Sequence, residues 1–332
     1  MKVRIIGDLY IDSEYMRGCF ESKKIKNIDI GSVQWVLETH GDLQKVNLLV
    51  EHGGSEVYEV PNYVINAIKD AEVIITQFCP VNRRVIDNCP DLKAIGTVRA
   101  GLENVNVEYA KEKGIRIFNN AGRNANAVAD FTVGMLLAEC RNIARAHAAI
   151  VSGSWNREFA NSGMVPDLPG KTIGIIGFGQ IGSKVARRLK AFDAKIICYD
   201  PYYCDTNTEF DFVDLNTLLE TSDFVTIHMR LTEDTHHMLG KAELAKMKST
   251  AYLINTARSG LIDEAALVEA LMKHQIMGAA LDVFEEEPLS TKNLLITLDN
   301  VTLTPHMAGV TRDAFWGAPD LLVERMREYL ES

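Results

Sequence analysis

The chain has 332 residues, of which 47% are hydrophobic and 24% charged, an ordinary globular composition with enough length for two domains. Its 45 acidic and 35 basic residues give a formal net charge of −10, which argues against a nucleic-acid-binding surface and favours a soluble protein. No apolar run reaches the roughly 18 residues that a membrane span requires, and residues 1–7 lead into a strand, not a signal peptide. We therefore expect a cytoplasmic protein with no nucleic-acid or membrane partner.

The cysteines are scattered along the chain, and no two of them form a C-x-x-C pair. Such spacing is typical of reduced thiols and not of a disulfide framework or a zinc site, so we expect no bound metal. The six positions are Cys19, Cys79, Cys89, Cys140, Cys198 and Cys204.

Strand-like and helix-like runs alternate along the chain, which predicts parallel sheets covered by helices. In the first third, short apolar runs predict buried strands, and segments with helical spacing lie between several of them. The predicted strands are Val3–Gly7, Val46–Val50, Val73–Thr76, Leu92–Thr97 and Ile115–Phe118. The predicted helices are Pro61–Lys69, Asn82–Asp87 and Asn106–Lys113.

A long segment rich in small and apolar residues follows, and it predicts one helix over Asn124–Ile150. A helix this apolar packs either in the core or against another subunit. Further strands are predicted at Thr172–Ile176, Ile196–Tyr199, Phe224–His228, Tyr252–Asn255, Gly278–Val283 and Val301–Leu303. A last helix, interrupted by Pro319, is predicted from Thr311 to Leu330.

The most informative motif is a glycine loop between a predicted strand and a predicted helix. It consists of Gly177, Phe178, Gly179, Gln180, Ile181 and Gly182. In a dinucleotide-binding fingerprint the first glycine makes a tight turn, the second lets the backbone approach a pyrophosphate, and the third lets helix pack on strand. The next strand ends on Asp200, whose carboxylate can accept hydrogen bonds from ribose hydroxyls and so favours NAD over NADP. The alternative interpretation is a structural turn that binds no ligand.

The glycine loop and the strands after it form a self-contained dinucleotide-binding sheet that does not need the final segment of the chain. We therefore expect a discontinuous substrate-binding domain of residues 1–101 and 300–332, and an NAD-binding domain of residues 102–299. The expected fold class is α/β, with two Rossmann- or flavodoxin-like, doubly wound parallel-sheet domains separated by a cleft. Ligands in such folds bind outside the carboxyl ends of the strands.

Arg258, Glu287 and His306 each come shortly after one of the last three predicted strands. Each has an ordinary alternative, as a surface cation, part of a solvated acidic run, or a structural histidine. Their recurrence at successive strand ends favours catalysis, in which Arg258 binds a carboxylate and the adjacent carbonyl oxygen and His306 exchanges the hydroxyl proton. Glu287 would hold the imidazole tautomer and keep a proton available near neutral pH. This set suits hydride transfer between a 2-hydroxy acid and a 2-keto acid, with a nicotinamide performing the redox step.

The chain resembles the D-isomer-specific 2-hydroxyacid dehydrogenase family, which includes enzymes acting on D-3-phosphoglycerate, D-lactate, hydroxypyruvate and glyoxylate. The resemblance covers nearly the whole chain and is densest from about Thr97 to Val310. Its motifs are Arg99-Ala100-Gly101, the glycine loop with Asp200, Asn255-Thr256-Ala257-Arg258, Asp282-Val283-Phe284 with Glu287-Pro288, and Thr304-Pro305-His306.

The resemblance implies that Arg258, Glu287 and His306 are the catalytic set of an NAD-dependent D-2-hydroxyacid dehydrogenase. It implies that the substrate contacts Arg258, His306 and the segment Arg99–Gly101, and that backbone N–H groups around Ala100–Gly101 would hold its carboxylate. It also implies a homodimer through the NAD-binding domain, with Asn124–Ile150 in the interface. The implied cofactor-binding residues are Gly177, Gly179, Gln180, Ile181, Gly182, Asp200, Ala257 and Asp282, the last facing the nicotinamide carboxamide.

Two departures from the family pattern bear on ligand binding. Met229-Arg230-Leu231 replaces the usual x-Pro-Leu and puts an unexpected cation near the cofactor edge. Thr76-Gln77-Phe78 occupies a strand end where phosphoglycerate enzymes often present arginine. Phe78, Phe315 and Trp316 therefore suggest an apolar acyl pocket, and the alternative is that these aromatic residues pack the domain core. The identity of the acid and the physiological direction of the reaction are not readable from the sequence.

Two other functions share this fold. An NAD-binding transcriptional corepressor can retain the whole Arg-Glu-His set, although the acidic net charge favours a metabolic enzyme. A formate dehydrogenase needs no proton relay and usually replaces the glutamate of the pair, so Glu287 disfavours that reaction.

Overall fold

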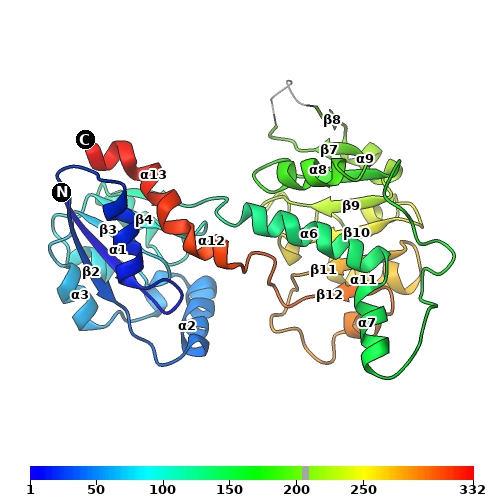
Figure 1. Cartoon of the computed structure of the whole chain (residues 1–332), viewed down its shortest axis with the longest axis horizontal. Coiled ribbons are helices and arrows are strands. Elements are labelled where there is room, and N and C mark those ends of the chain that lie inside the picture. Colours follow the sequence, from blue (N-terminus) through cyan, green and yellow to red (C-terminus); the bar gives the residue numbers. More distant parts are fainter. Residues whose placement is uncertain (204–208) are drawn as a thin grey trace. The chain divides into compact units, whose positions relative to one another are not determined.

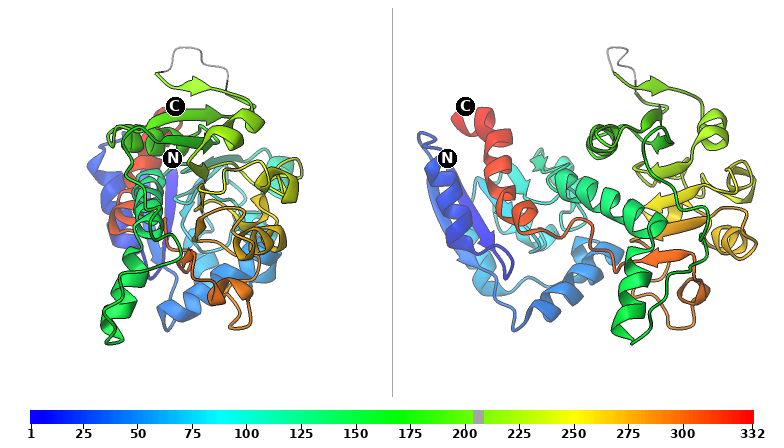
Figure 2. Two further views of the ribbon diagram at one scale, coloured as in Figure 1. Left: turned by 90° about the vertical axis from the view of Figure 1, so that its right-hand side faces the viewer. Right: turned by 45° about the vertical axis from the view of Figure 1, so that its right-hand side comes forward.

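The computed structural model describes residues 1–203 and 209–332 (Figures 1 and 2). The chain divides into two compact units, Met1–Arg123 with Thr311–Ser332, and Asn124–Val310, which are described separately. Each unit is built on a parallel sheet flanked by helices, which confirms the predicted α/β class with two parallel sheets. The cysteines within the described residues are buried and have free thiols, whereas Cys204 lies outside those residues.

The first unit contains a five-stranded parallel sheet with strand order β2-β1-β3-β4-β5. Its strands are β1 (Lys2–Gly7), β2 (Asp29–Gln34), β3 (Val73–Thr76), β4 (Ala94–Thr97) and β5 (Arg116–Asn119). Its helices are α1 (Ser13–Ser22), α2 (His40–Gly53), η1 (Ser55–Val57), α3 (Asn62–Ile68), α4 (Arg83–Asp87), α5 (Val107–Glu112), α12 (Arg312–Trp316) and α13 (Ala318–Glu331). One hydrophobic cluster joins the sheet to α1 and α13, and another joins it to α2, α3, α4 and α5.

The C-terminal helix α13 packs closely on β4 because that strand carries a glycine. A Cβ atom at Gly96 would lie 2.7 Å from the Sδ atom of Met326, so a larger residue would push α13 away from the sheet. Pro319 lies in the first turn of α13, directly after the short helix α12. The predicted interruption of the last helix by this proline is therefore confirmed, since a proline fits the first turn but not a helix interior.

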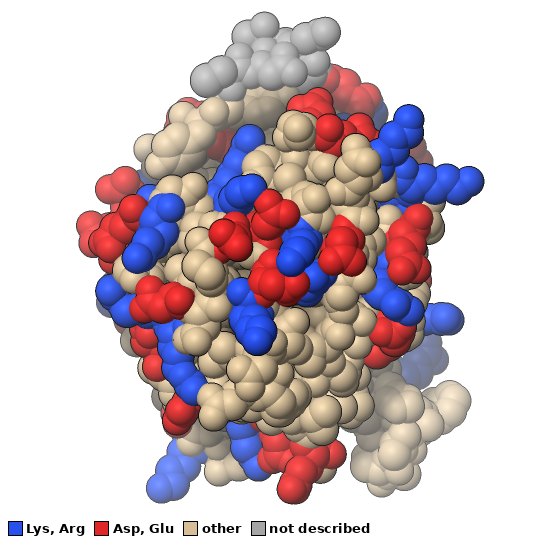
Figure 3. Space-filling model, turned by 90° about the vertical axis from the view of Figure 1, so that its left-hand side faces the viewer, with Lys and Arg blue, Asp and Glu red and all other residues tan. Residues whose placement is uncertain are grey.

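Charged side chains of both signs are interspersed on the face of the molecule in Figure 3. Within the first unit, the Nζ atom of Lys23 lies 3.1 Å from the Oδ1 atom of Asp320 and 3.4 Å from the Oε1 atom of Glu324.

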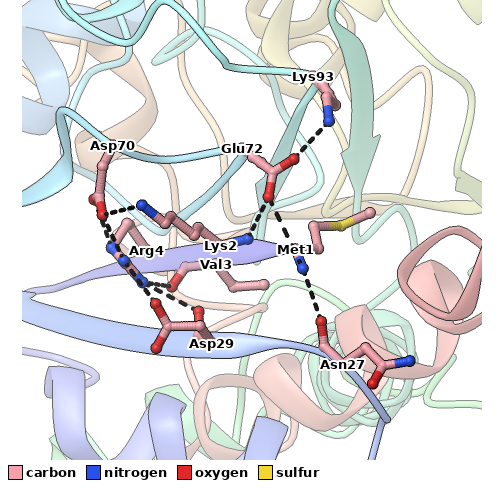
Figure 4. A network of polar contacts seen from close by, with 9 residues as sticks. All are labelled: Met1, Lys2, Val3, Arg4, Asn27, Asp29, Asp70, Glu72 and Lys93. Atoms are coloured by element: carbon pink, nitrogen blue, oxygen red, sulfur yellow. Dashed lines mark hydrogen bonds and ion pairs between the residues drawn. The ribbon is translucent and has the colours of Figure 1, made fainter.

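A polar network ties the amino end of β1 to its two neighbouring segments (Figure 4). The Nε and Nη2 atoms of Arg4 each lie 2.8 Å from an oxygen of Asp70, and Nη2 also lies 2.9 Å from the Oδ2 atom of Asp29. The hydrogen bond from Arg4 holds the pKa of Asp70 well below its usual range. Glu72 accepts a backbone hydrogen bond from Lys2 and pairs with Lys93, which fixes the segment before β3.

The second unit contains a seven-stranded parallel sheet with strand order β12-β11-β10-β9-β6-β7-β8. Its strands are β6 (Thr172–Ile176), β7 (Lys195–Tyr199), β8 (Asp211–Phe212), β9 (Phe224–Ile227), β10 (Tyr252–Asn255), β11 (Gly278–Leu281) and β12 (Val301–Leu303). Its helices are α6 (Ala125–Cys140), α7 (Ile143–Val151), α8 (Gly182–Lys190), α9 (Leu215–Thr221), α10 (Lys241–Leu244), η2 (Ser259–Leu261), α11 (Glu264–Met272) and η3 (Leu294–Thr297). The predicted strands of this unit are confirmed within about two residues, the uncertainty normal for element boundaries.

The strand predicted at Val46–Val50 is wrong, because these residues lie inside α2. The side chain of Thr39 caps this helix by accepting a hydrogen bond from the N–H of Asp42. Leu43 and Val50, seven residues apart, are buried on one side of α2, which is helical and not strand periodicity. The second strand of the sheet is instead β2, an edge strand of mixed polarity that the apolar-run criterion missed.

The single helix predicted over Asn124–Ile150 is also wrong, because the structure has two helices there, α6 and α7. Asn142, between them, has a left-handed backbone with φ of 55°, a conformation that asparagine adopts more readily than most residues. Its side-chain amide donates to the Oδ1 atom of Asn161, whose own amide donates to the carbonyl of Cys140. This long-range contact ends α6 and turns the chain into α7.

The unit boundaries lie later in the chain than the expected positions after residues 101 and 299. Strand β5 pairs with β4, so the chain leaves the first sheet only after this strand, and the first unit ends at Arg123. Strand β12 pairs with β11, so the second sheet is complete only after Leu303, and the chain re-enters the first unit at Thr311.

Candidate active site

The first glycine of the loop makes a turn that no other residue would fit. Gly177 has a φ of 91°, and its N–H donates to the carbonyl of Tyr199 in β7. A Cβ atom at Gly177 would lie 2.7 Å from the carbonyl carbon of His228, in the segment after β9. Gly177 therefore allows the loop to lie directly against the carboxyl end of β9.

The other two glycines have different surroundings. A Cβ atom at Gly182 would lie 1.9 Å from the carbonyl oxygen of Gly177, so this glycine is needed for α8 to start against the turn. A Cβ atom at Gly179 would meet nothing within 4 Å, so the middle of the loop faces open space. Ile181, the N-cap of α8, makes no side-chain capping hydrogen bond, although the first-turn N–H groups of Ser183 and Lys184 donate to the carbonyls of Gly179 and Ile181. The positive end of the α8 dipole nevertheless faces the loop. The loop thus fits the diphosphate of a dinucleotide.

Asp200 follows β7 and is bonded to the glycine loop. Its Oδ2 atom accepts a hydrogen bond of 2.8 Å from the N–H of Phe178, and its Oδ1 atom accepts one of 2.9 Å from the N–H of Tyr202. An ionised carboxylate has about four acceptor sites, so Asp200 retains capacity for ribose hydroxyls. The bond to Phe178 shows that Asp200 also braces the loop, a role that the sequence pattern did not indicate.

Arg258 follows β10 on a turn that Asn255 holds in place. The Oδ1 atom of Asn255 accepts a hydrogen bond of 3.0 Å from the N–H of Ala257, and its amide donates to the carbonyl of Arg258 at 2.9 Å. The side chain of Arg258 is exposed, and its Nη1 atom donates to the carbonyl of Ala257. The guanidinium forms no ion pair within the described residues, so it is available to a carboxylate.

Glu287 and His306 are in direct contact in the second unit. The Oε2 atom of Glu287 lies 2.8 Å from the Nδ1 atom of His306, and its Oε1 atom accepts a hydrogen bond of 3.0 Å from the N–H of Phe284. Half of the His306 side chain is exposed, and its Nε2 atom has no hydrogen-bond partner among the described residues. The geometry leaves Nε2 free to exchange a proton while Glu287 orients the ring.

The loop that carries His306 is anchored by Asp282, a carboxylate with no exposed surface. Its Oδ1 atom accepts hydrogen bonds from the hydroxyl of Thr304 at 2.6 Å and the N–H of Met307 at 3.0 Å. Its Oδ2 atom accepts one of 2.8 Å from the N–H of Ala308. Asp282 therefore fixes the backbone on both sides of His306, whose φ of 49° is itself unusual for a histidine.

The segment Arg99–Gly101 belongs to the first unit. The guanidinium of Arg99 is nearly buried and is occupied by α2, since it donates to Asn47 at 2.8 Å and to Glu51 at 2.6 Å. The carbonyl of Ala100 accepts a hydrogen bond from the side chain of Asn119. The N–H of Arg99 donates to the hydroxyl of Thr97 at 3.3 Å. The groups that remain for a ligand in this segment are therefore the backbone N–H groups of Ala100 and Gly101 and not the arginine side chain.

The aromatic residues considered for an acyl pocket pack against other rings of the first unit. Phe78 and Phe315 both contact Tyr10, with ring centroids 5.8 and 5.2 Å from its ring, and Trp316 contacts Tyr15. Phe78 is nearly buried. This packing agrees with the alternative interpretation, in which these side chains stabilise the domain.

No group of three or more His, Cys, Asp or Glu side chains within residues 1–203 and 209–332 is placed to hold a metal ion. No helix in the same part of the chain is long and apolar enough to cross a membrane.

Residues 133–308 match the family model described as D-isomer specific 2-hydroxyacid dehydrogenase, NAD binding domain. A D-3-phosphoglycerate dehydrogenase of Methanocaldococcus jannaschii is 41% identical over 292 residues, which cover 86% of this chain but only 55% of that relative. A hydroxypyruvate reductase of Thermotoga maritima is 40% identical over 254 residues, covering 76% of this chain and 82% of the relative. The crystal structure of D-lactate dehydrogenase with NAD⁺ from Lactobacillus jensenii is similar with a TM-score of 0.73 and 25% identity, covering 100% of this chain and 97% of that one.

Proposed function

Because the chain belongs to the D-isomer specific 2-hydroxyacid dehydrogenase family and is an NAD-dependent oxidoreductase of that class, we propose that Arg258, Glu287 and His306 carry out its chemistry. The reaction is the reversible conversion of a D-2-hydroxy acid to its 2-keto acid. The observation that carries this proposal is the 2.8 Å contact between Glu287 and His306, which leaves the second imidazole nitrogen free. The relatives are named D-3-phosphoglycerate dehydrogenase and hydroxypyruvate reductase. These names favour neither the corepressor alternative nor the formate dehydrogenase alternative.

His306 acts as the proton-transfer group. During oxidation its Nε2 atom takes the proton of the substrate hydroxyl, and during reduction it returns a proton to the carbonyl oxygen. Glu287 accepts the hydrogen bond from the Nδ1–H group, selects the tautomer with Nε2 as base, and stabilises the imidazolium that forms. NAD, when bound, supplies the hydride chemistry by accepting or donating a hydride at its nicotinamide ring.

Arg258 binds the carboxylate of the substrate. Its exposed guanidinium has no competing carboxylate partner within the described residues, and its planar fork matches a carboxylate and the neighbouring carbonyl oxygen.

The glycine loop binds the diphosphate of NAD, and Asp200 binds the adenine ribose. The open space at Gly179 and the start of α8 directly after the loop support the first assignment, and the remaining acceptor capacity of Asp200 supports the second. We further propose that Ala257 contacts the nicotinamide half. The carboxylate of Asp282, expected at the carboxamide, is instead buried and bonded to Thr304, Met307 and Ala308, so we propose that it positions His306. Gln180 and Ile181 complete the loop that covers the diphosphate.

The reaction is tested with a panel of 2-keto acids that differ in size and charge, by following the loss of NADH absorbance. We expect reduction of at least one monocarboxylic 2-keto acid and formation of the D-hydroxy acid, which chiral chromatography of the product identifies. If NADH binds but no keto acid of the panel causes its oxidation, the proposal is contradicted.

We propose that the protein is a homodimer assembled through the second unit. Helix α7 and the segment after it expose several large apolar side chains, and a second copy of this chain would cover them. Figure 2 shows α7 at the edge of its unit. The exposed residues are Ile143, Ile150, Val151 and Trp155, of which Trp155 is 84% exposed.

We also propose a cytoplasmic location. The described cysteines are free and buried, which suits a reducing compartment. Fractionation of cells followed by detection of the protein in each fraction tests this assignment.

A further inference from the structure

The strand order of the second unit identifies the crevice in which the dinucleotide lies. From β6 the chain proceeds to β7 and β8 on one side, and then returns to β9 on the other side of β6. The order therefore reverses between β6 and β9, and a doubly wound sheet binds its ligand at the carboxyl ends of the two strands that flank this reversal. The segment after β6 is the glycine loop, and the segment after β9 begins with His228, Met229 and Arg230.

These two segments touch each other. The N–H of His228 donates to the carbonyl of Ile176 at 2.7 Å, which extends the pairing of β9 with β6. A Cβ atom at Gly177 would lie 2.8 Å from the backbone nitrogen of Met229. Arg230 directly follows Met229, and consecutive Cα atoms are about 3.8 Å apart. The backbone of Arg230 therefore lies within one residue of the turn that fits the diphosphate.

The turn that carries Arg230 is held rigidly, while the arginine side chain is free. The hydroxyl of Thr235 donates to the carbonyl of Arg230 at 2.7 Å and accepts a hydrogen bond from the N–H of Thr232 at 2.8 Å. The Arg230 side chain is exposed and forms neither an ion pair nor a hydrogen bond within the described residues. The exposed acidic residues of the same turn, Glu233 and Asp234, are not paired with it.

Between the end of β9 and Arg230, the other basic side chain in the described part of the chain is that of His228. Burial lowers the pKa of His228 to about 3, so its imidazole is neutral at physiological pH. Its Nε2 atom contacts the hydroxyl of Thr226 at 3.0 Å. The positive charge at the start of the turn is therefore that of Arg230.

We infer that Arg230 is a phosphate-binding residue of the cofactor site, whose guanidinium pairs with the diphosphate bridge of the bound dinucleotide. The inference rests on the proposed NAD binding at the glycine loop. A guanidinium offers two parallel N–H groups that match phosphate oxygens, and it adds a full positive charge to the backbone N–H groups of the loop and of α8. A proline, the residue usual at this position in the family, has no side-chain N–H group and could not make this contact.

The test measures binding and not turnover. The dissociation constants of NADH, ADP and adenosine are determined for the wild type and for Arg230→Gln, by NADH fluorescence and by competition. We expect Arg230→Gln to weaken NADH and ADP by roughly tenfold, the scale of one charge-assisted hydrogen bond, and to leave adenosine unchanged. Arg230→Lys should recover part of the loss. Lys195→Gln, which removes an exposed cation at the opposite, amino-terminal edge of the same sheet, should change none of the three values.

Each other result has one meaning. Unchanged NADH binding in Arg230→Gln overturns the inference, as does an equal loss for adenosine and ADP, which would indicate stacking on the base. A loss of affinity confined to NADPH would assign Arg230 to a 2′-phosphate. A raised KM for the keto acid with unchanged NADH binding would assign Arg230 to the substrate. Both results would contradict the diphosphate contact. If the wild type itself fails to bind NADH, the proposed function fails instead.

Discussion

At the scale of single residues, the contact between Glu287 and His306 gives the two imidazole nitrogens different roles. Replacing His306 by Ala removes the proton-transfer group and should lower kcat by roughly 10² or more, because general acid–base catalysis contributes on that scale. Steady-state rates with the best substrate of the panel, together with an NADH dissociation constant equal to that of the wild type, check this prediction. A His306→Ala enzyme with normal kcat would show that proton transfer runs elsewhere.

The companion prediction concerns Glu287, which acts only through His306. Glu287→Gln keeps the side-chain size but loses the negative charge that stabilises the imidazolium. The rate of keto-acid reduction should therefore fall in the variant, while the NADH dissociation constant stays unchanged. Steady-state kinetics and NADH fluorescence measure the two quantities, and a kcat equal to that of the wild type would contradict the prediction.

The carboxylate of Asp200 should set the cofactor preference. A negative charge beside the adenine ribose repels a 2′-phosphate, so NADH should exceed NADPH in kcat/KM by about tenfold or more. Asp200→Asn should narrow this ratio mainly by improving NADPH. Because Asp200 also accepts hydrogen bonds from Phe178 and Tyr202, thermal unfolding must show that the variant is intact. Equal use of both cofactors by the wild type would contradict the assignment.

The sequence predicts a candidate catalytic set, Arg258, Glu287 and His306, because each of these residues follows an apolar strand and the carboxyl ends of parallel strands share one edge of the sheet. It does not predict the contacts that hold these residues in place. The anchoring by Asp282 depends on backbone N–H groups of the loop after β12, whose direction no residue pattern reveals. A buried aspartate after a strand is nevertheless a signal for such a loop anchor.

At the scale of elements, the carboxyl end of β1 is bound to its neighbours through Asp8. Its buried carboxylate accepts hydrogen bonds from the N–H groups of Tyr10, Ile11 and Phe78, which join the β1–α1 turn to the end of β3. Burial raises the pKa of Asp8 from 3.8 to about 6. Between these values the native state keeps a proton that the unfolded state has released, so the free energy of unfolding falls as the pH rises.

This linkage predicts a pH-dependent effect of Asp8→Asn. The stability of the wild type relative to the variant should be larger near pH 4 than near pH 7, by on the order of 3 kcal/mol. Urea unfolding at both pH values measures the difference. Asp42→Asn is the control, because the hydrogen bond from Thr39 lowers the pKa of Asp42. The stability of the wild type relative to Asp42→Asn should therefore not fall as the pH rises. A constant difference for Asp8→Asn would contradict the prediction.

Strands that are fully buried could be predicted from apolar runs. An edge strand of mixed polarity and a helix break that depends on a distant residue could not. The strands β3, β6 and β10 are buried along nearly their whole length, so apolar runs identified them. The edge strand β2 contains Asp29, Ser32 and Gln34 and carries no such run. The break between α6 and α7 depends on Asn161, a residue far along the chain from the break, which local periodicity does not register.

At the scale of the whole molecule, the chain places the catalytic set, the glycine loop and the exposed face of α7 in one unit, Asn124–Val310. The loop between α6 and α7 is fixed to this unit by a buried network, in which Arg145 pairs with both oxygens of Glu139 and Thr302 donates to the same carboxylate. Assembly through α7 would therefore act on a helix that is tied to β12, the strand directly before His306.

The dimer proposal predicts that one charge on α7 produces monomers. Ile150 is 52% exposed on α7, and a carboxylate there would be buried without a partner if a second copy covers the helix. Light scattering coupled to size exclusion should give a dimer for the wild type and a monomer for Ile150→Glu. Val36→Glu, at an exposed apolar residue of the first unit, should stay dimeric. NADH binding by the Ile150→Glu monomer would show that the second unit remains folded, and an unchanged dimer would place the interface elsewhere.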